Sequence, residues 1–150
     1  MKIAVGSDHA GYDAKERLKA GLQERGLAVE DVGTDGLASV DYPDFAFEVG
    51  DRVASGGCDL GVLVCGSGIG MAIAANKIPG VRAATCVDPY SAAMARRHND
   101  ANVLCLGARI SGPDLLEAIL AGFLDASFED GRHARRVNKI KSRETGGANR

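Results

Sequence analysis

The chain has 150 residues, of which 45% are hydrophobic and 25% are charged, as is typical of a water-soluble globular domain. Its length allows one sizeable core, and its net charge of -2 gives no reason to expect nucleic acid or an anionic membrane as a partner. No apolar stretch approaches the roughly 20 residues that span a bilayer, and the first residues resemble a strand rather than a signal peptide. We therefore expect a cytoplasmic protein whose four cysteines are reduced.

Strands and helices alternate along the chain. Hydrophobic runs predict strands at 2–6, 27–32, 60–64, 81–87 and 103–107. Helical periodicity and boundary residues predict helices at 10–25, 41–55, in the small-residue segment that ends at 76, and at 89–98, 111–124 and 132–143. The alternation predicts an α/β fold in which right-handed βαβ units form a parallel sheet covered on both faces. We expect one domain, 1–143, followed by a flexible polar tail, 144–150, that frays.

The stretch 60–76 combines a buried strand, a glycine-rich loop and a helix. Cys65 stands where the strand ends, and Gly66, Ser67 and Gly68 follow it directly. A strand, a glycine loop and a helix in this order place backbone N–H groups around an anion site. A thiol beside a helix N-terminus is favoured as the thiolate, which indicates a reactive Cys65. The alternative is a small core cysteine before a tight turn.

Polar residues also follow the other predicted strands. Asp8 and His9 come after the first strand, Asp88 after the fourth and Arg109 after the fifth. The carboxyl ends of parallel strands meet at one edge of a sheet, where ligands bind in open α/β folds. These residues are therefore expected to lie near the glycine loop. His9 could instead cap the first helix, and Asp88 could be only an N-cap.

Two further groups of basic residues lie later in the chain. His98 closes a helix, where a histidine interacts favourably with the helix dipole whether or not it is catalytic. Arg132 and Arg136 stand four residues apart, so they share one helix face and can converge on one dianion. A solvated basic face explains the same spacing.

A dinucleotide site is the main competing interpretation of the glycine loop. Gly66 and Gly68 follow a strand, and Asp88 lies about twenty residues further on, as that fingerprint requires. Met71 occupies the third glycine position, however, and Gly70 is one residue early. The chain also has no room for a second substrate domain.

Several short motifs recur together in the order found in one known family. They are Gly6-Ser7-Asp8-His9-Ala10-Gly11, Asp41-Tyr42-Pro43, Cys65-Gly66-Ser67-Gly68-Ile69-Gly70, Ala74-Ala75-Asn76-Lys77, Arg96-Arg97-His98-Asn99 and Gly131-Arg132-His133 with Arg136. With these motifs the chain resembles the type B ribose-5-phosphate isomerases, relatives of the galactose-6-phosphate isomerase subunits, over nearly its whole length. The resemblance implies a Rossmann-like three-layer sandwich with a five-stranded parallel sheet, a homodimer (sometimes a tetramer) and no metal or organic cofactor.

The same resemblance implies roles for individual residues. Cys65 would be the base that moves a proton between adjacent sugar carbons, and His98 would help to open the furanose ring. Ser67, through its hydroxyl, is the third residue expected to be catalytic. The remaining residues implied in substrate binding are the loop residues Gly66, Ser67, Gly68, Ile69 and Gly70, whose N–H groups would hold the enediolate, Asp8, His9 and Asn99 around the sugar, and Arg109, Arg132 and Arg136 on the phosphate.

The residues and the resemblance together predict an aldose–ketose isomerase of the pentose phosphate pathway. It would interconvert D-ribose 5-phosphate and D-ribulose 5-phosphate in a homodimer whose active site lies at the subunit interface. The alternatives are an isomerase of a six-carbon aldose phosphate, such as allose 6-phosphate or galactose 6-phosphate, and a non-catalytic phosphosugar- or nucleotide-binding module. The three histidines, His9, His98 and His133, are scattered, and no short-spaced histidine–carboxylate pair is recognised, so no metal is expected.

Overall fold

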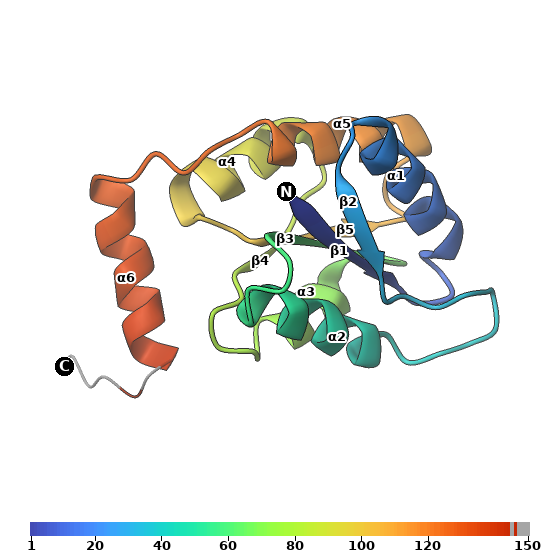
Figure 1. Ribbon diagram of the computed structural model, residues 1–150, viewed down its shortest axis with the longest axis horizontal. Coiled ribbons are helices and arrows are strands. Elements are labelled where there is room, and N and C mark those ends of the chain that lie inside the picture. Colours follow the sequence, from blue (N-terminus) through green and yellow to red (C-terminus); the bar gives the residue numbers. More distant parts are fainter. Residues whose placement is uncertain (145, 147–150) are drawn as a thin grey trace.

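Five parallel strands form the middle layer of the structure, a computed structural model that describes residues 1–144 and 146 (Figure 1). They lie in the order β2-β1-β3-β5-β4. Their bounds are Lys2–Ser7 for β1, Ala28–Asp31 for β2, Leu60–Cys65 for β3, Ala83–Thr85 for β4 and Val103–Gly107 for β5. The predicted five-stranded parallel sheet is confirmed.

Helices cover both faces of this sheet (Figure 1). One face carries α1, α4 and α5, and the other carries α2 and α3. The last helix, α6, contacts the end of the domain through α4 and stands to one side of the sandwich. The helices are α1 (Tyr12–Glu24), α2 (Tyr42–Ala54), α3 (Ile69–Ala75), α4 (Pro89–Asn99), α5 (Pro113–Leu124) and α6 (Arg132–Glu144).

The core consists of two apolar clusters, one on each face of the sheet. Along β1, Ile3 and Val5 belong to the cluster under α1 and α5, whereas Ala4 belongs to the cluster under α2 and α3. Every residue of β3 is buried, because β3 is the central strand and is covered on both sides. A strand buried on both faces needs a continuous apolar run rather than an alternating one, which is why 60–64 was recognisable in the sequence.

The fourth strand is shorter than predicted. The sequence predicts a strand over 81–87, but β4 spans only Ala83–Thr85. It is an edge strand, and its start is held by side chains: the N–H of Arg82 donates to Asn102 Oδ1 at 2.7 Å, and the N–H of Ala83 donates to Asn76 Oδ1 at 2.8 Å. Amide side chains therefore replace part of the expected ladder.

The end of the chain is described only in part. Glu144 is the last residue of α6, and its carboxylate accepts the N–H of Gly80 at 2.9 Å. Most of the predicted polar tail, residues 145 and 147–150, lies outside the described residues. Within the described part, no helix combines the length and apolar character that crossing a membrane requires.

Candidate active site

The glycine loop after β3 holds the thiol of Cys65 against the backbone. Cys65 is buried, and its Sγ accepts the N–H of Gly68 at 3.1 Å. Gly68 has φ of +77°, and a Cβ there would lie 2.9 Å from the carbonyl carbon of Leu106, so only glycine fits. The loop is also tied to the next strand, because Thr85 Oγ1 donates to the Gly68 carbonyl at 3.1 Å. The thiol thus occupies a rigid position at the carboxyl edge of the sheet.

Two N–H groups of the predicted enediolate cradle already have partners within the chain. The N–H of Gly68 donates to Cys65 Sγ, and that of Ile69 donates to Ser67 Oγ at 3.3 Å. The cradle therefore offers an anion fewer free donors than the sequence indicated. The hydroxyl oxygen of Ser67 thus accepts a hydrogen bond from within the loop, from the N–H of Ile69.

A cleft of about 360 Å³ opens in front of the thiol. Asp8 contributes to its wall from the end of β1, where its carboxylate is fixed by the N–H groups of Ala10 and Gly11, both at 3.0 Å. Arg109 contributes from the loop after β5, and its backbone N–H donates to the carbonyl of Gly66 at 3.0 Å. The structure therefore brings together Asp8, Cys65, most of the glycine loop and Arg109, as predicted. The lining residues are Asp8, Tyr42, Cys65, Gly66, Ser67, Gly70, Arg109 and Ile110.

Two residues from the same edge have other surroundings. The Nδ1 atom of His9 accepts the N–H of Val40 at 3.2 Å, so this side chain ties the end of β1 to the segment before α2. It is neither a helix cap nor part of the lining of the cleft. Asp88 accepts the N–H of Ser91 at 2.7 Å as the N-cap of α4, and this bond lowers the pKa of its carboxyl. The N-cap interpretation of Asp88 is confirmed.

His98 and Asn99 lie at the opposite edge of the sheet from Cys65. Helix α4 runs antiparallel to the strands, and the loop after it reaches the start of β3, where the N–H of Gly61 donates to the carbonyl of Asn102 at 2.8 Å. The four steps along β3 from Gly61 to Cys65 span about 13 Å at the usual rise of a strand. One chain therefore does not bring the predicted ring-opening histidine to the thiol.

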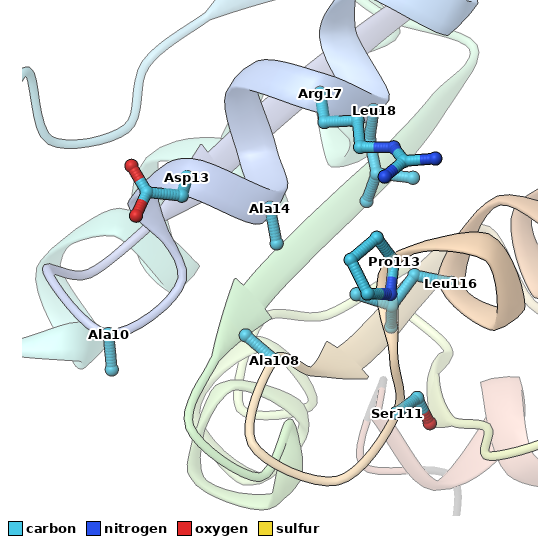
Figure 2. A pocket seen from close by; sticks show the side chains of 9 residues that line it. All are labelled: Ala10, Asp13, Ala14, Arg17, Leu18, Ala108, Ser111, Pro113 and Leu116. Atoms are coloured by element: carbon cyan, nitrogen blue, oxygen red, sulfur yellow. The ribbon is translucent and has the colours of Figure 1, made fainter.

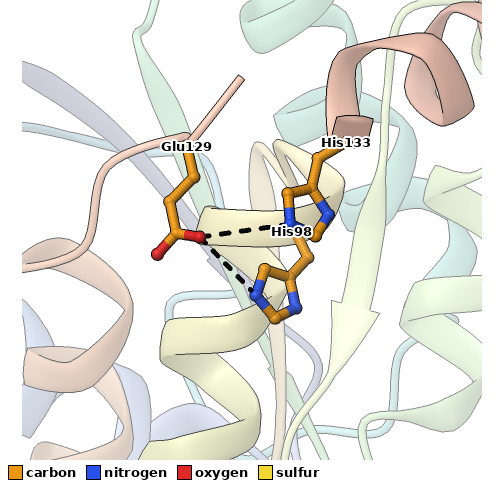
Figure 3. A group of neighbouring side chains, drawn as sticks. All are labelled: His98, Glu129 and His133. Atoms are coloured by element: carbon orange, nitrogen blue, oxygen red, sulfur yellow. Dashed lines mark ion pairs between the residues drawn. The ribbon is translucent and has the colours of Figure 1, made fainter. Parts of the chain in front are cut away.

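The two distant histidines form one cluster with a carboxylate (Figure 3). The rings of His98 and His133 are stacked, with centroids 4.2 Å apart and planes 4° from parallel. Oε2 of Glu129 lies 3.8 Å from Nε2 of His98 and 4.0 Å from Nε2 of His133. The expectation of scattered histidines is wrong for His98 and His133, because the chain between them leads back to α4 and places the two rings side by side. The sequence held a signal that was overlooked, since Glu129 and His133 stand four apart.

The surroundings of this cluster are basic. Burial lowers the pKa of His133, and the charges of His98, Arg132 and Arg136 lower it further. Arg97 lies 4.0 Å from the Glu129 carboxylate. These three residues could hold a metal ion, since their ligand atoms lie within 4.8 Å of one another. The positive charge of Arg97 beside the Glu129 carboxylate disfavours a second cation at this place.

The three arginines expected to bind phosphate differ in position but share one property. Arg109 lines the cleft, whereas Arg132 and Arg136 are exposed on α6. Within residues 1–144 and 146, none of the three forms an ion pair with a carboxylate, although most other arginines do so. Their charges are therefore available to a ligand.

A separate cavity of about 320 Å³ lies between α1 and α5 (Figure 2). Its walls are mainly small and apolar side chains, including Ala14, Leu18 and Leu116. Its one cation, Arg17, is paired with Asp114 and Glu117. This cavity therefore has no available positive charge for a phosphate, and the thiol cleft remains the candidate active site.

A parallel α/β sandwich with a thiol, an N–H loop and a free arginine at its carboxyl edge defines an enzyme for small anionic substrates. Residues 3–140 match the model of the Ribose/Galactose Isomerase family. The chain belongs to this family.

Named relatives and solved structures agree with this assignment. The chain is 47% identical to "Ribose-5-phosphate isomerase B" of Escherichia coli (strain K12), over 95% of the chain and 96% of the relative. It is 45% identical to "D-erythrulose-4-phosphate isomerase" of Pectobacterium atrosepticum, over 93% of each. The structure of ribose-5-phosphate isomerase B from Clostridium thermocellum superposes with a TM-score of 0.96, at 52% identity, over 97% of this chain and 99% of that one. The Mycoplasma genitalium enzyme with bound ribulose-5-phosphate gives a TM-score of 0.93, at 44% identity over 96% of both chains.

Proposed function

We propose that the protein interconverts D-ribose 5-phosphate and D-ribulose 5-phosphate through an enediolate. The observation that carries this proposal is the cleft in which a buried thiol, a glycine loop and Arg109 meet, and among the described residues no carboxylate pairs with Arg109. Relatives of nearly equal length are named for this activity. The reaction belongs to the pentose phosphate pathway, and four free cysteines fit a cytoplasmic location.

In the proposed mechanism, Cys65 transfers one proton. The thiolate takes the proton from C2 of the open-chain aldose, and the electron pair moves to the carbonyl oxygen on C1, which gives the enediolate. The thiol then returns its proton to C1, while the hydroxyl proton on the C2 oxygen passes to the C1 oxygen as the carbonyl forms at C2, so the atoms balance without a cofactor. The N–H of Gly68, 3.1 Å from Sγ, holds the sulfur in position for this transfer.

A second copy of the chain would complete this site. His98, Asn99, Arg132 and Arg136 lie too far from Cys65 in one chain, as the position of α4 requires. Apolar side chains near the cleft are exposed, Ile69 to 58% and Ile110 to 61%, which is typical of a surface that another protein covers. We therefore propose a homodimer, with a tetramer as a further possibility, in which the partner supplies the ring-opening histidine and two of the three phosphate arginines.

Assays of ribose 5-phosphate and allose 6-phosphate side by side test this function. We expect reversible turnover of the pentose phosphate at the higher kcat/KM. The family is named for ribose and for galactose, a six-carbon sugar, so a six-carbon aldose phosphate is the second candidate. Binding of both compounds without turnover of either would favour a phosphosugar-binding module instead.

Removal of metal ions is expected to leave the rate unchanged. The thiol and the N–H groups supply the base and the anion stabilisation, and the cluster of His98, Glu129 and His133 lies in basic surroundings. The enzyme should be treated exhaustively with a chelator, and kcat measured before and after treatment. If zinc or manganese restored the lost rate in the parent enzyme but not in Glu129→Gln, the cluster would be a metal site after all.

Replacement of His98 should affect the two directions of the reaction unequally. Ribose 5-phosphate is mostly cyclic, whereas ribulose 5-phosphate cannot close a furanose ring because its C5 oxygen is phosphorylated. If His98 opens the ring, His98→Asn should lower forward turnover by about 10²–10⁴-fold, the usual range for general acid–base catalysis. The chemical step from ribulose 5-phosphate, measured in a single turnover, should fall less. Equal losses in both directions would indicate a structural role.

A further inference from the structure

We propose that Tyr42 is a further catalytic residue, whose phenol hydroxyl donates a hydrogen bond to an enediolate oxygen. This inference rests on the proposed isomerase function. Tyr42 lines the cleft together with Asp8, Cys65 and Gly70. In the sequence it belongs to the start of a predicted helix and to the Asp41-Tyr42-Pro43 motif, but no role was predicted for its side chain. It is the aromatic residue among those that line this cleft.

The ring of Tyr42 lies directly against Gly70. A Cβ on Gly70 would lie 2.7 Å from both Cε2 and Cζ of the ring and 3.0 Å from its hydroxyl oxygen. Contacts this short show that the phenol end of the ring lies on the α-carbon of Gly70, in the first turn of α3. The hydroxyl is therefore within reach of the place where the N–H groups of the loop would hold the enediolate.

The Tyr42 hydroxyl supplies a hydrogen-bond donor near a loop in which two N–H groups are already bonded within the chain. The N–H groups of Gly68 and Ile69 are used inside the chain, by Cys65 Sγ and Ser67 Oγ. The Tyr42 hydroxyl makes no hydrogen bond to any residue among 1–144 and 146, and the side chain is partly exposed to the cleft. A phenol O–H held by a rigid element is a strong donor to a developing oxyanion.

Helix α2 fixes the ring in place. Tyr42 is its first residue and is followed by Pro43, which favours a helix start, and Ala46 and Val49 anchor the helix in the core. The ring also lies over the α-carbon of Gly70. The hydroxyl is thus positioned before substrate binds, which is what stabilisation of a transition state requires.

Tyr42→Phe removes the hydroxyl and leaves the ring. We expect kcat for ribose 5-phosphate to fall by about 10–100-fold, at or below the usual loss for one oxyanion donor. The dissociation constant of ribitol 5-phosphate, which has no carbonyl and forms no enediolate, should stay within about threefold, because the hydrogen bond strengthens only as charge develops. Tyr90→Phe is the matched control, since Tyr90 is 74% exposed on α4, and it should keep the parent's kcat.

A second set of variants tests the contact itself. Gly70 lies within α3 and has no positive φ, so alanine is compatible with its backbone, and the three atoms nearest to the new methyl group all belong to Tyr42. Gly70→Ala should therefore displace the ring and lower kcat about as much as Tyr42→Ala does. In the Tyr42→Ala background the obstruction is gone, and Gly70→Ala should cost little more. Circular dichroism should show the same melting transition for all four proteins.

The outcomes separate this inference from the proposed function. The isomerase function and the role of Tyr42 are both supported if the parent enzyme turns over ribose 5-phosphate and Tyr42→Phe loses kcat but keeps its affinity for ribitol 5-phosphate. Active parent enzyme with an unchanged Tyr42→Phe kcat, or with a loss confined to affinity, would overturn the inference alone. Parent enzyme that turns over no sugar phosphate would overturn the proposed function and the role of Tyr42 with it.

Discussion

Cys65→Ala is expected to abolish nearly all turnover of ribose 5-phosphate while the fold is retained. The thiol lies in the cleft and accepts the N–H of Gly68 at 3.1 Å, and it is the proposed base for both proton transfers. General-base catalysis typically contributes about 10²–10⁴-fold to a rate, so a loss of this size is expected. Alanine is smaller than cysteine by one sulfur atom, so the core should lose little packing energy.

The matched control is Cys58→Ala. Cys58 is buried in the same apolar cluster as Cys65 but lies before the start of β3, far from the cleft. Burial, followed by the charge of Glu30, raises the pKa of its thiol, so it does not act as a thiolate near neutral pH. Cys58→Ala should keep the parent's kcat, and both variants should keep the parent's circular dichroism. A Cys65→Ala enzyme that retains activity within a few-fold of the parent would disprove the assignment of the base.

Most of the fold was predictable because burial leaves a direct record in the sequence. Strands β1, β3 and β5 lie in the interior of the sheet and read as apolar runs, and helices α4 and α5 begin with a proline after a capping position. The prediction failed where tertiary contacts decide the structure. The length of β4 depends on Asn76 and Asn102, whose amide groups bond the backbone beside it, and no periodicity in 81–87 reports those bonds.

The candidate site was predictable only where chain order determines position. Residues directly after β1, β3 and β5 meet at one edge because the strands are parallel, and Asp8, Cys65 and Arg109 do meet there. The stacking of His98 on His133 depends instead on the return of α6 to α4. Tyr42 was missed because its contact with Gly70 joins two helices that are separated by a strand.

The second large effect expected is recovery of activity when two defective chains are combined. Arg132 and Arg136 belong to α6, which contacts the end of α4, at the edge of the sheet away from Cys65. Neither arginine forms an ion pair with a carboxylate in the described part of the chain, so both are free to bind phosphate. In a dimer with the proposed site, the base of one chain therefore works with the phosphate arginines of the other.

Each lost arginine–phosphate contact should cost about 1.5–3 kcal/mol, so Arg136→Ala should raise KM by roughly ten- to a hundredfold. In a heterodimer of Cys65→Ala with Arg136→Ala, one site carries both defects and the other carries neither. Chains with different tags should be exchanged by mild denaturation and refolding, and the heterodimer isolated on both tags. Its kcat/KM, measured at low substrate, should approach half that of the parent dimer. Isolated heterodimers no more active than the two variant homodimers would place the whole site within one chain.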